Sequence, residues 1–108
     1  MYTSNGSSAQ GVRRSERVRA HVPVTLIWHE HEHRQTERTY TAAVSRFGCL
    51  VLCRCNLPPG TAIRIEHDRK VMLGKISYCL KDCATKLVEL GIAFDEDGTD
   101  FWGVGFDA

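Results

Sequence analysis

Apolar and polar residues alternate along much of the chain, and this alternation predicts β-strands. The first run places six apolar side chains on one face, at Val18, Ala20, Val22, Val24, Leu26 and Trp28. Period two is the repeat of an extended strand with one buried face. Pro23 removes one backbone donor from the run, so we expect this strand to lie at an edge or to bulge near its middle.

Later runs predict five more strands. Their ranges are 40–44, 49–55, 62–66, 71–80 and 88–94. The run at 49–55 is nearly all apolar, which indicates a strand covered on both faces. Polar residues 29–37 predict an exposed connection, and residues 56–60 and 81–86 predict loops. Six short strands separated by turn residues favour an all-β fold, a closed or nearly closed antiparallel barrel.

The two ends of the chain do not follow the strand pattern. Residues 1–12 are rich in Ser, Gly and Asn without periodicity and predict a flexible tail, which leaves 13–108 as the domain. Asp97 or Thr99 can cap one helical turn near the C-terminus, whereas two later glycines oppose a longer helix. We expect this turn, or an aromatic lid, to cover the open end of the barrel. Its aromatic residues are Phe101, Trp102 and Phe106.

Composition narrows the class of protein. The chain has 108 residues, 43% of them apolar and 25% charged, which suits one globular domain. A net charge of +1 argues against a general nucleic-acid binder. No apolar run is long enough for a membrane span, and the first residues lack the apolar core of a signal peptide. We therefore expect a cytoplasmic protein whose five cysteines are reduced.

Two motifs carry candidate chemistry. Residues 13–19 hold four arginines against one glutamate, among them Arg13, Arg14 and Arg17. Guanidinium groups match phosphate oxygens and also stack on flat rings. The turn from Ser45 to Gly48 joins two apolar runs, and we expect its backbone N–H groups to point outward. An arginine arm near such a turn predicts a site for a phosphorylated small molecule.

The pair of motifs resembles the PilZ domain, a bacterial receptor module for cyclic di-GMP. The family pattern RxxxR falls on Arg13 to Arg17, and [D/N]xSxxG falls on residues 43–48. The resemblance extends from Arg13 to about Phe106 and implies a six-stranded barrel. It also implies that the arginines clamp the nucleotide while Ser45 and Gly48 position it.

Ala43 departs from the family pattern, which has Asp or Asn at this position. The resemblance implies that this residue exchanges hydrogen bonds with the guanine edge, and alanine makes none. Such a loss costs roughly 1.5–3 kcal/mol where a charged partner is involved, or about ten- to a hundredfold in affinity. Thr41, two residues earlier on the same strand, is an inferior substitute.

The sequence therefore leaves two functions open. The first is a single-domain cyclic di-GMP receptor, not an enzyme, that signals to a separate protein partner when its arginine arm becomes ordered. The second is a degenerate PilZ-like module that no longer binds nucleotide and contacts proteins, for example through an exposed aromatic cluster at 101–106. No nucleophile elbow, phosphate-binding glycine loop or metalloprotease spacing indicates catalysis.

Histidines and cysteines offer weaker patterns. His29, His31 and His33 can share one strand face and hold a metal, although an exposed polar loop is the simpler interpretation. The cysteines lack CxxC spacing, and Cys49, Cys53 and Cys55 fall where small core residues belong. Cys83 is expected at the surface. We predict no metal and no cofactor.

Overall fold

The computed structural model describes residues 17–103, which form seven strands and one short helix. The predicted tail 1–12 and two arginines of the arm, Arg13 and Arg14, lie outside these residues. The elements are β1 (Val18–Arg19), β2 (Pro23–Glu30), β3 (His33–Ser45), β4 (Gly48–Cys53), β5 (Ala62–His67), β6 (Lys70–Lys81), β7 (Val88–Phe94) and α1 (Thr99–Trp102).

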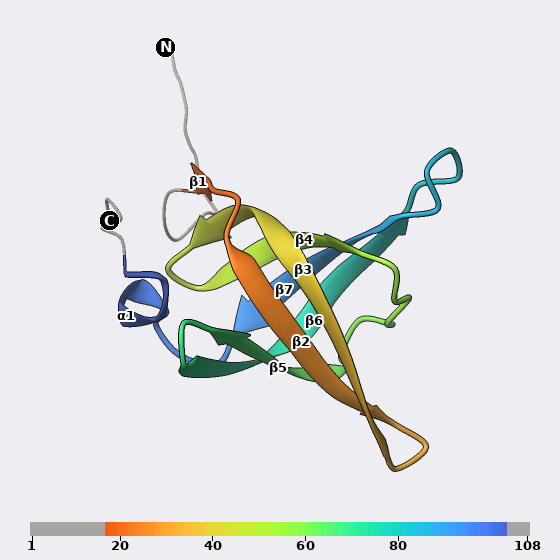
Figure 1. Cartoon of the computed structure of the whole chain (residues 1–108), viewed down its shortest axis with the longest axis horizontal. Coiled ribbons are helices and arrows are strands. Elements are labelled where there is room, and N and C mark those ends of the chain that lie inside the picture. The colour runs from red at the N-terminus through yellow and green to blue at the C-terminus, as the bar shows by residue number, and fades with distance from the viewer. Residues whose placement is uncertain (1–16, 104–108) are drawn as a thin grey trace.

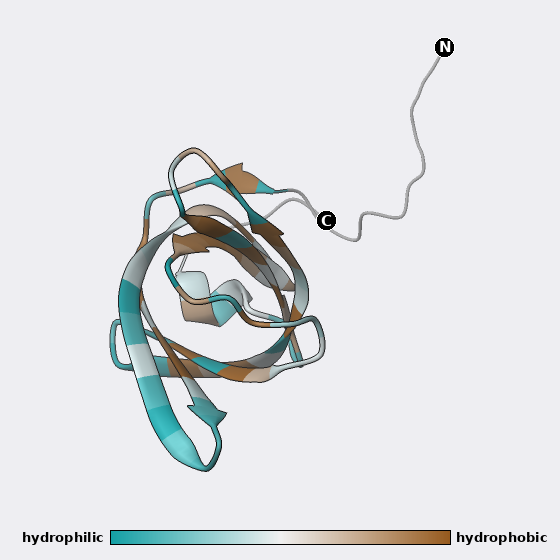
Figure 2. Ribbon diagram, turned by 90° about the vertical axis from the view of Figure 1, so that its right-hand side faces the viewer, coloured by the Kyte–Doolittle hydropathy of each residue, from teal (hydrophilic) through white to brown (hydrophobic). Residues whose placement is uncertain are grey.

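Six antiparallel strands close into a barrel. The sheet order is β1-β3-β2-β5-β6-β7-β4, and pairing between β3 and β4 joins the two sides (Figure 1). Strand β1 adds to the edge of β3, with Val18 opposite Val44. The view in Figure 2 looks into the ring of strands, with α1 at its centre. The predicted all-β barrel of six strands is confirmed, with one short strand in addition.

The barrel core follows from the alternation in the sequence. Inward residues of every barrel strand are buried, and the most enclosed are Leu26, Ile65, Ile76, Leu90, Val44 and Val51. Each apolar side chain so buried contributes about 1.5–3 kcal/mol relative to an exposed one. The strand at 48–53 differs from the prediction, because Leu52 on its outer face is 43% exposed. This strand is therefore covered on one face only.

The first predicted strand is divided in the structure. Residues 20–22 separate β1 from β2, and β2 starts at Pro23. The buried Thr41 occupies the break: its hydroxyl donates to the Ala20 carbonyl at 2.5 Å and accepts from the Val22 amide at 3.0 Å. A proline at the first position of a strand loses no ladder bond. The expected irregularity near Pro23 is confirmed, and the single continuous strand is wrong.

The predicted exposed connection at 29–37 is present as a hairpin, but it is much shorter than expected. Most of this segment is strand, and only His31 and Glu32 form the turn between β2 and β3. Both turn residues have positive φ, 51° and 68°, as a tight two-residue hairpin requires. The hairpin projects beyond the barrel (Figures 1 and 2). Main-chain pairing needs no apolar side chains, so a polar segment can form strands that the apolar pattern does not predict.

The C-terminal segment forms the predicted helical turn and the predicted lid together. Asp97 Oδ1 accepts hydrogen bonds from the amide and hydroxyl of Thr99, at 2.8 and 2.7 Å. Gly103 ends the helix with φ of 72°. Phe101 and Trp102 are buried in the barrel core. They are therefore unavailable as the exposed aromatic cluster that the second function used, and Phe106 lies outside the described residues.

Helix α1 is the one helix among residues 17–103, and a single turn is far too short to cross a bilayer.

Candidate functional site

A cleft of about 190 Å³ lies beside the turn between β3 and β4. Its walls come from the segment before β1, from the facing ends of β3 and β4, and from β6 and β7. Three of the predicted site residues line it together, namely Arg17, Ser45 and Gly48, and so does Ala43. The other two predicted residues, Arg13 and Arg14, lie outside the described part of the chain.

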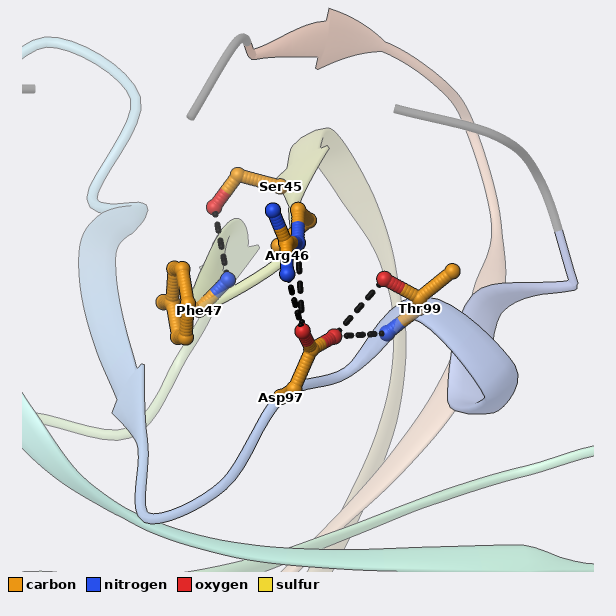
Figure 3. Close-up of polar contacts among 5 residues, drawn as sticks. All are labelled: Ser45, Arg46, Phe47, Asp97 and Thr99. Carbon is orange, nitrogen blue, oxygen red and sulfur yellow. Dashed lines mark hydrogen bonds and ion pairs between the residues drawn. The ribbon is translucent and has the colours of Figure 1, made fainter. Parts of the chain in front are cut away.

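The Ser45 hydroxyl serves the turn itself. Its oxygen accepts from the Phe47 amide at 3.3 Å (Figure 3). The hydroxyl also donates to the Gly48 carbonyl, which lies 3.5 Å away. For Phe47 this corrects the expectation of an outward-pointing N–H group, because its amide is bonded inside the turn. Ser45 thus fixes the shape of the cleft wall. A hydrogen bond from its hydroxyl to a ligand requires it to leave the Gly48 carbonyl.

The carbonyl groups of the turn are bonded to the C-terminal part of the chain. Trp102 Nε1 donates to the Ser45 carbonyl at 3.0 Å. The amide of Gly98 donates to the carbonyl of Arg46 at 2.5 Å, and the amide of Phe94 donates to that of Phe47 at 2.8 Å. These bonds hold the turn against β7 and α1. The cleft is therefore built on a fixed edge, which favours recognition without reorganisation.

An ion pair reinforces the same connection. Arg46 Nε and Nη2 both donate to Asp97 Oδ2, at 3.1 and 2.5 Å (Figure 3). The Arg46 guanidinium holds the pKa of Asp97 well below its usual range, and the hydrogen bonds from Thr99 act in the same direction. Both charged groups are partly exposed, so the pair orients the turn more than it stabilises the fold.

Gly48 is needed for packing and not for an unusual backbone angle. It is absent from the glycines with positive φ, which corrects the conformational role expected for it. A Cβ atom at this position would lie 2.2 Å from the Ile92 carbonyl oxygen on β7. The close approach of β4 to β7 therefore excludes any side chain here.

Comparison with solved structures assigns the fold. The chain is similar to Bacillus subtilis inhibitor of motility MotI/DgrA, with a TM-score of 0.64 and 14% identity over 87% of this chain. It is also similar to the PilZ domain of Escherichia coli YcgR, solved with c-di-GMP, with a TM-score of 0.53, 17% identity and 79% coverage of each chain. The fold is that of a PilZ domain. The match spans 47% of the MotI/DgrA chain, so this chain accounts for about half of that protein.

Neither a family model nor a curated protein matches the sequence. The assignment of the PilZ fold therefore rests on the structure. At 14–17% identity, the likeness to these two chains concerns the fold alone.

The PilZ-fold cleft also contains an aromatic residue that the sequence motifs did not indicate. Tyr78 lies opposite Gly91 in the β6–β7 ladder, and a Cβ at Gly91 would lie 2.3 Å from its ring. The ring therefore rests on the glycine backbone. Its hydroxyl donates to Glu89 at 3.0 Å. Burial and this bond raise the pKa of Tyr78, while the positive charge of Arg17 acts to lower it.

Ala43 stands at the position that the PilZ pattern gives to Asp or Asn. It is half-buried, lies on β3 opposite Leu50 and lines the cleft. Thr41 does not replace the missing polar group, because its side chain is 2% exposed and is bonded to the Ala20–Val22 break. A bulge between residues 41 and 43 shifts the register of β3, so the side chains of Thr41 and Ala43 no longer lie on the same face of the sheet. The suggested substitution by Thr41 is therefore wrong.

The histidine run forms no cluster of metal ligands among residues 17–103, where the cluster found joins Glu37, Cys53 and Cys55. The predicted surface position of Cys83 is confirmed, and so is the core position of Cys53. Cys49 is half-buried, packs against the core and lines the cleft.

Proposed function

We propose that this protein is a single-domain receptor for cyclic di-GMP that transmits the signal to a separate protein. One observation carries the proposal: on a PilZ fold, Arg17 lines the same cleft as Ser45 and Gly48. The YcgR domain with this fold was solved with c-di-GMP. A guanidinium group at this place supplies the charge and the planar donors that a phosphate diester requires.

The size of the cleft limits how much of the nucleotide it can hold. Ligand pockets usually measure about 300–1,000 Å³, so a cleft of about 190 Å³ takes only part of a dinucleotide. We assign one base to the cleft, beside the ring of Tyr78, and the phosphates to Arg17. Arg13 and Arg14 then cover the outer side of the ligand. Closing of this arm over the nucleotide is the signal that a partner reads.

The role assigned to each residue differs from the family pattern in one respect. Ser45 and Gly48 shape the rim of the cleft through the internal bonds of the turn, and arginine supplies most of the attraction. Arginine-dominated binding of a doubly charged ligand weakens with salt. A cytoplasmic location agrees with five free cysteines, since a reducing compartment keeps thiols reduced.

A second function is favoured by Ala43 and by the internal bonding of Ser45. Together they remove a side-chain partner of guanine and occupy the hydroxyl of another motif residue. A PilZ-fold module that contacts proteins without nucleotide is the alternative.

Calorimetric titration of the full chain with cyclic di-GMP tests the receptor proposal. We expect saturable binding, an affinity loss of at least about tenfold in Arg17→Ala, and no change in the control Arg34→Ala. Removing a charged hydrogen bond of about 1.5–3 kcal/mol gives a loss of this size. Arg34 is exposed on the outer hairpin, away from the cleft residues. If the unmodified chain releases no heat at millimolar nucleotide, the protein-contact function replaces the receptor.

Restoring the family residue sharpens this test. Ala43→Asn should raise the affinity about ten- to a hundredfold, because it returns the hydrogen bonds that alanine lacks. The half-buried position within the cleft leaves the new amide next to the ligand. A variant that folds normally and gains no affinity would show that the base is not held at Ala43.

A further inference from the structure

Glu37, Cys53 and Cys55 come together away from the nucleotide cleft. Glu37 lies on β3, Cys53 ends β4, and Cys55 follows in the loop. One carboxylate oxygen and the two sulfurs lie within 4.8 Å of one another. Glu37 precedes Ser45 by eight residues, so about 26 Å of extended strand separates this cluster from the turn beside the cleft.

Glu37 is unusual because its side chain is on the inward face of the barrel. It is paired across the ladder with Leu26, which is fully buried, and paired residues share a face. Its carboxylate accepts the amide of Arg54 at 2.8 Å. In the described part of the chain, the ion pairs found are Arg46–Asp97 and Arg64–Glu66, so Glu37 has no cationic side chain as a partner. A half-buried carboxylate of this kind is costly unless a cation neutralises it.

The two thiols are held next to this carboxylate. Cys53 Sγ and Cys55 Sγ are 3.3 Å apart, and Cys53 Sγ also lies 3.5 Å from the Cys55 carbonyl. Cys53 is 2% exposed, whereas Cys55 is half-buried. The hydrogen bond from Cys55 lowers the pKa of Cys53 and raises that of Cys55.

We propose that Glu37, Cys53 and Cys55 bind a thiophilic divalent cation of the zinc class. Two thiolates and one carboxylate are a donor set that zinc accepts, and soft sulfur ligands disfavour magnesium and calcium. Zinc–sulfur bonds of about 2.3 Å in a tetrahedron place two sulfurs about 3.8 Å apart, so the thiols need to separate by only about 0.5 Å. Water completes the fourth position. This proposal is independent of nucleotide binding.

The cation would connect β3 to the loop after β4. Glu37 is already fixed by the Arg54 amide, and Arg54 lies between the two cysteines, so the three ligands are joined before the metal arrives. Such preorganisation lowers the entropic cost of binding. Both thiols release a proton when they coordinate the metal, so the affinity falls as the pH is lowered.

Cobalt(II) titration of the reduced, chelator-stripped chain tests the site. Cobalt(II) bound by thiolates gives a sulfur-to-metal charge-transfer band, and zinc should abolish this band at one equivalent per chain. We expect Cys55→Ser and Glu37→Gln each to weaken zinc binding by more than about tenfold, since even residues that only orient a metal ligand change affinity ten- to a hundredfold. Cys83→Ser, which removes an exposed thiol in another loop, is the matched control and should bind as the unmodified chain does.

Cys53→Ser places a hydroxyl in the core and can lower stability by itself, so Cys55→Ser and Glu37→Gln decide the outcome. Circular dichroism checks that each variant is folded. Zinc should also raise the thermal unfolding midpoint of the unmodified chain and not that of Cys55→Ser. Absence of the charge-transfer band, or equal zinc affinity in Cys55→Ser and Cys83→Ser, would overturn the proposal.

Discussion

Strand β3 ends in two turns that are held in different ways. The turn that precedes it, His31–Glu32, is exposed at the tip of a hairpin that projects beyond the barrel. The turn that follows it, at 45–48, is bonded to residues as far as 57 positions later in the chain. Both turns join neighbouring antiparallel strands, so local turn chemistry is not what separates them. Attachment to the C-terminal segment makes the second turn a rigid edge suited to a binding cleft.

Among the substitutions that test this comparison, removal of Trp102 should change the free energy of unfolding most. Its ring is 6% exposed and stacks with Phe94 at 5.7 Å between centroids, so Trp102→Ala should lower the free energy of unfolding by about 3–5 kcal/mol. Trp102→Phe keeps an aromatic ring and loses the bond to the Ser45 carbonyl, which should cost about 1 kcal/mol. Urea denaturation measures both values. A control at the free end, His33→Ala, should change stability by less than about 0.5 kcal/mol. Equal losses of unfolding free energy in Trp102→Ala and His33→Ala would mean that the turns at the two ends of β3 are held equally firmly.

Neutralising Asp97 should have a smaller effect that depends on pH. The folded pKa of Asp97 lies below the unfolded one because of Arg46 and Thr99, so the ionised carboxylate stabilises the fold at pH values above about 4. We expect Asp97→Asn to be less stable than the unmodified chain at pH 7. That gap should close as the pH falls below 4, and added salt should narrow it. Denaturation at several pH values measures the difference, with the exposed Glu96→Gln as the control. A stability difference that is independent of pH would mean that the charge of Asp97 contributes nothing and that only its hydrogen bonds with Thr99 matter.

The smallest effect is expected at the free turn, and it should be stabilising. His31 and Glu32 both have positive φ, which costs free energy in residues other than glycine and asparagine. The double substitution His31→Asn, Glu32→Gly gives the favoured sequence for this turn and should raise the free energy of unfolding by about 0.5–1 kcal/mol. Thermal unfolding checks the direction, and cyclic di-GMP titration should show no change. Altered nucleotide binding would show that the projecting hairpin communicates with the cleft.

The fold was largely predictable because its signals are local. The apolar pattern predicted six strands at approximate positions, although the range 40–44 covered only the second half of β3, and the loop at 56–60 was recognisable from its composition. Polar composition concealed the outer half of the β2–β3 hairpin. The break in the first strand was indicated by Pro23 and located by Thr41, a residue 19 positions from its partner Val22.

The candidate site was predictable only as a list of residues. Serine and glycine in register at 45–48 indicated the turn, but the direction of its hydrogen bonds depends on Trp102, Gly98 and Phe94. Tyr78 gave no signal, because an aromatic residue in a strand is ordinary until its partner across the ladder proves to be glycine. Cys53 and Cys55 lack the CxxC spacing of a zinc site, and Glu37, 16 positions before Cys53 in the sequence, lies close to both sulfurs only in the folded barrel.

The sequence by itself determined that this chain is a β-barrel with a PilZ-like pair of motifs, since strand periodicity and turn chemistry are properties of neighbouring residues. Tertiary structure decided what each polar group or glycine contacts. Thr41 is buried and bonded to the break between β1 and β2, Gly48 packs against the backbone of β7, and Glu37 lies beside two thiols. The physical reason is strand register. Hydrogen-bonded ladders set which distant residues face one another, and a shift of one position would turn every side chain of a strand to the other face.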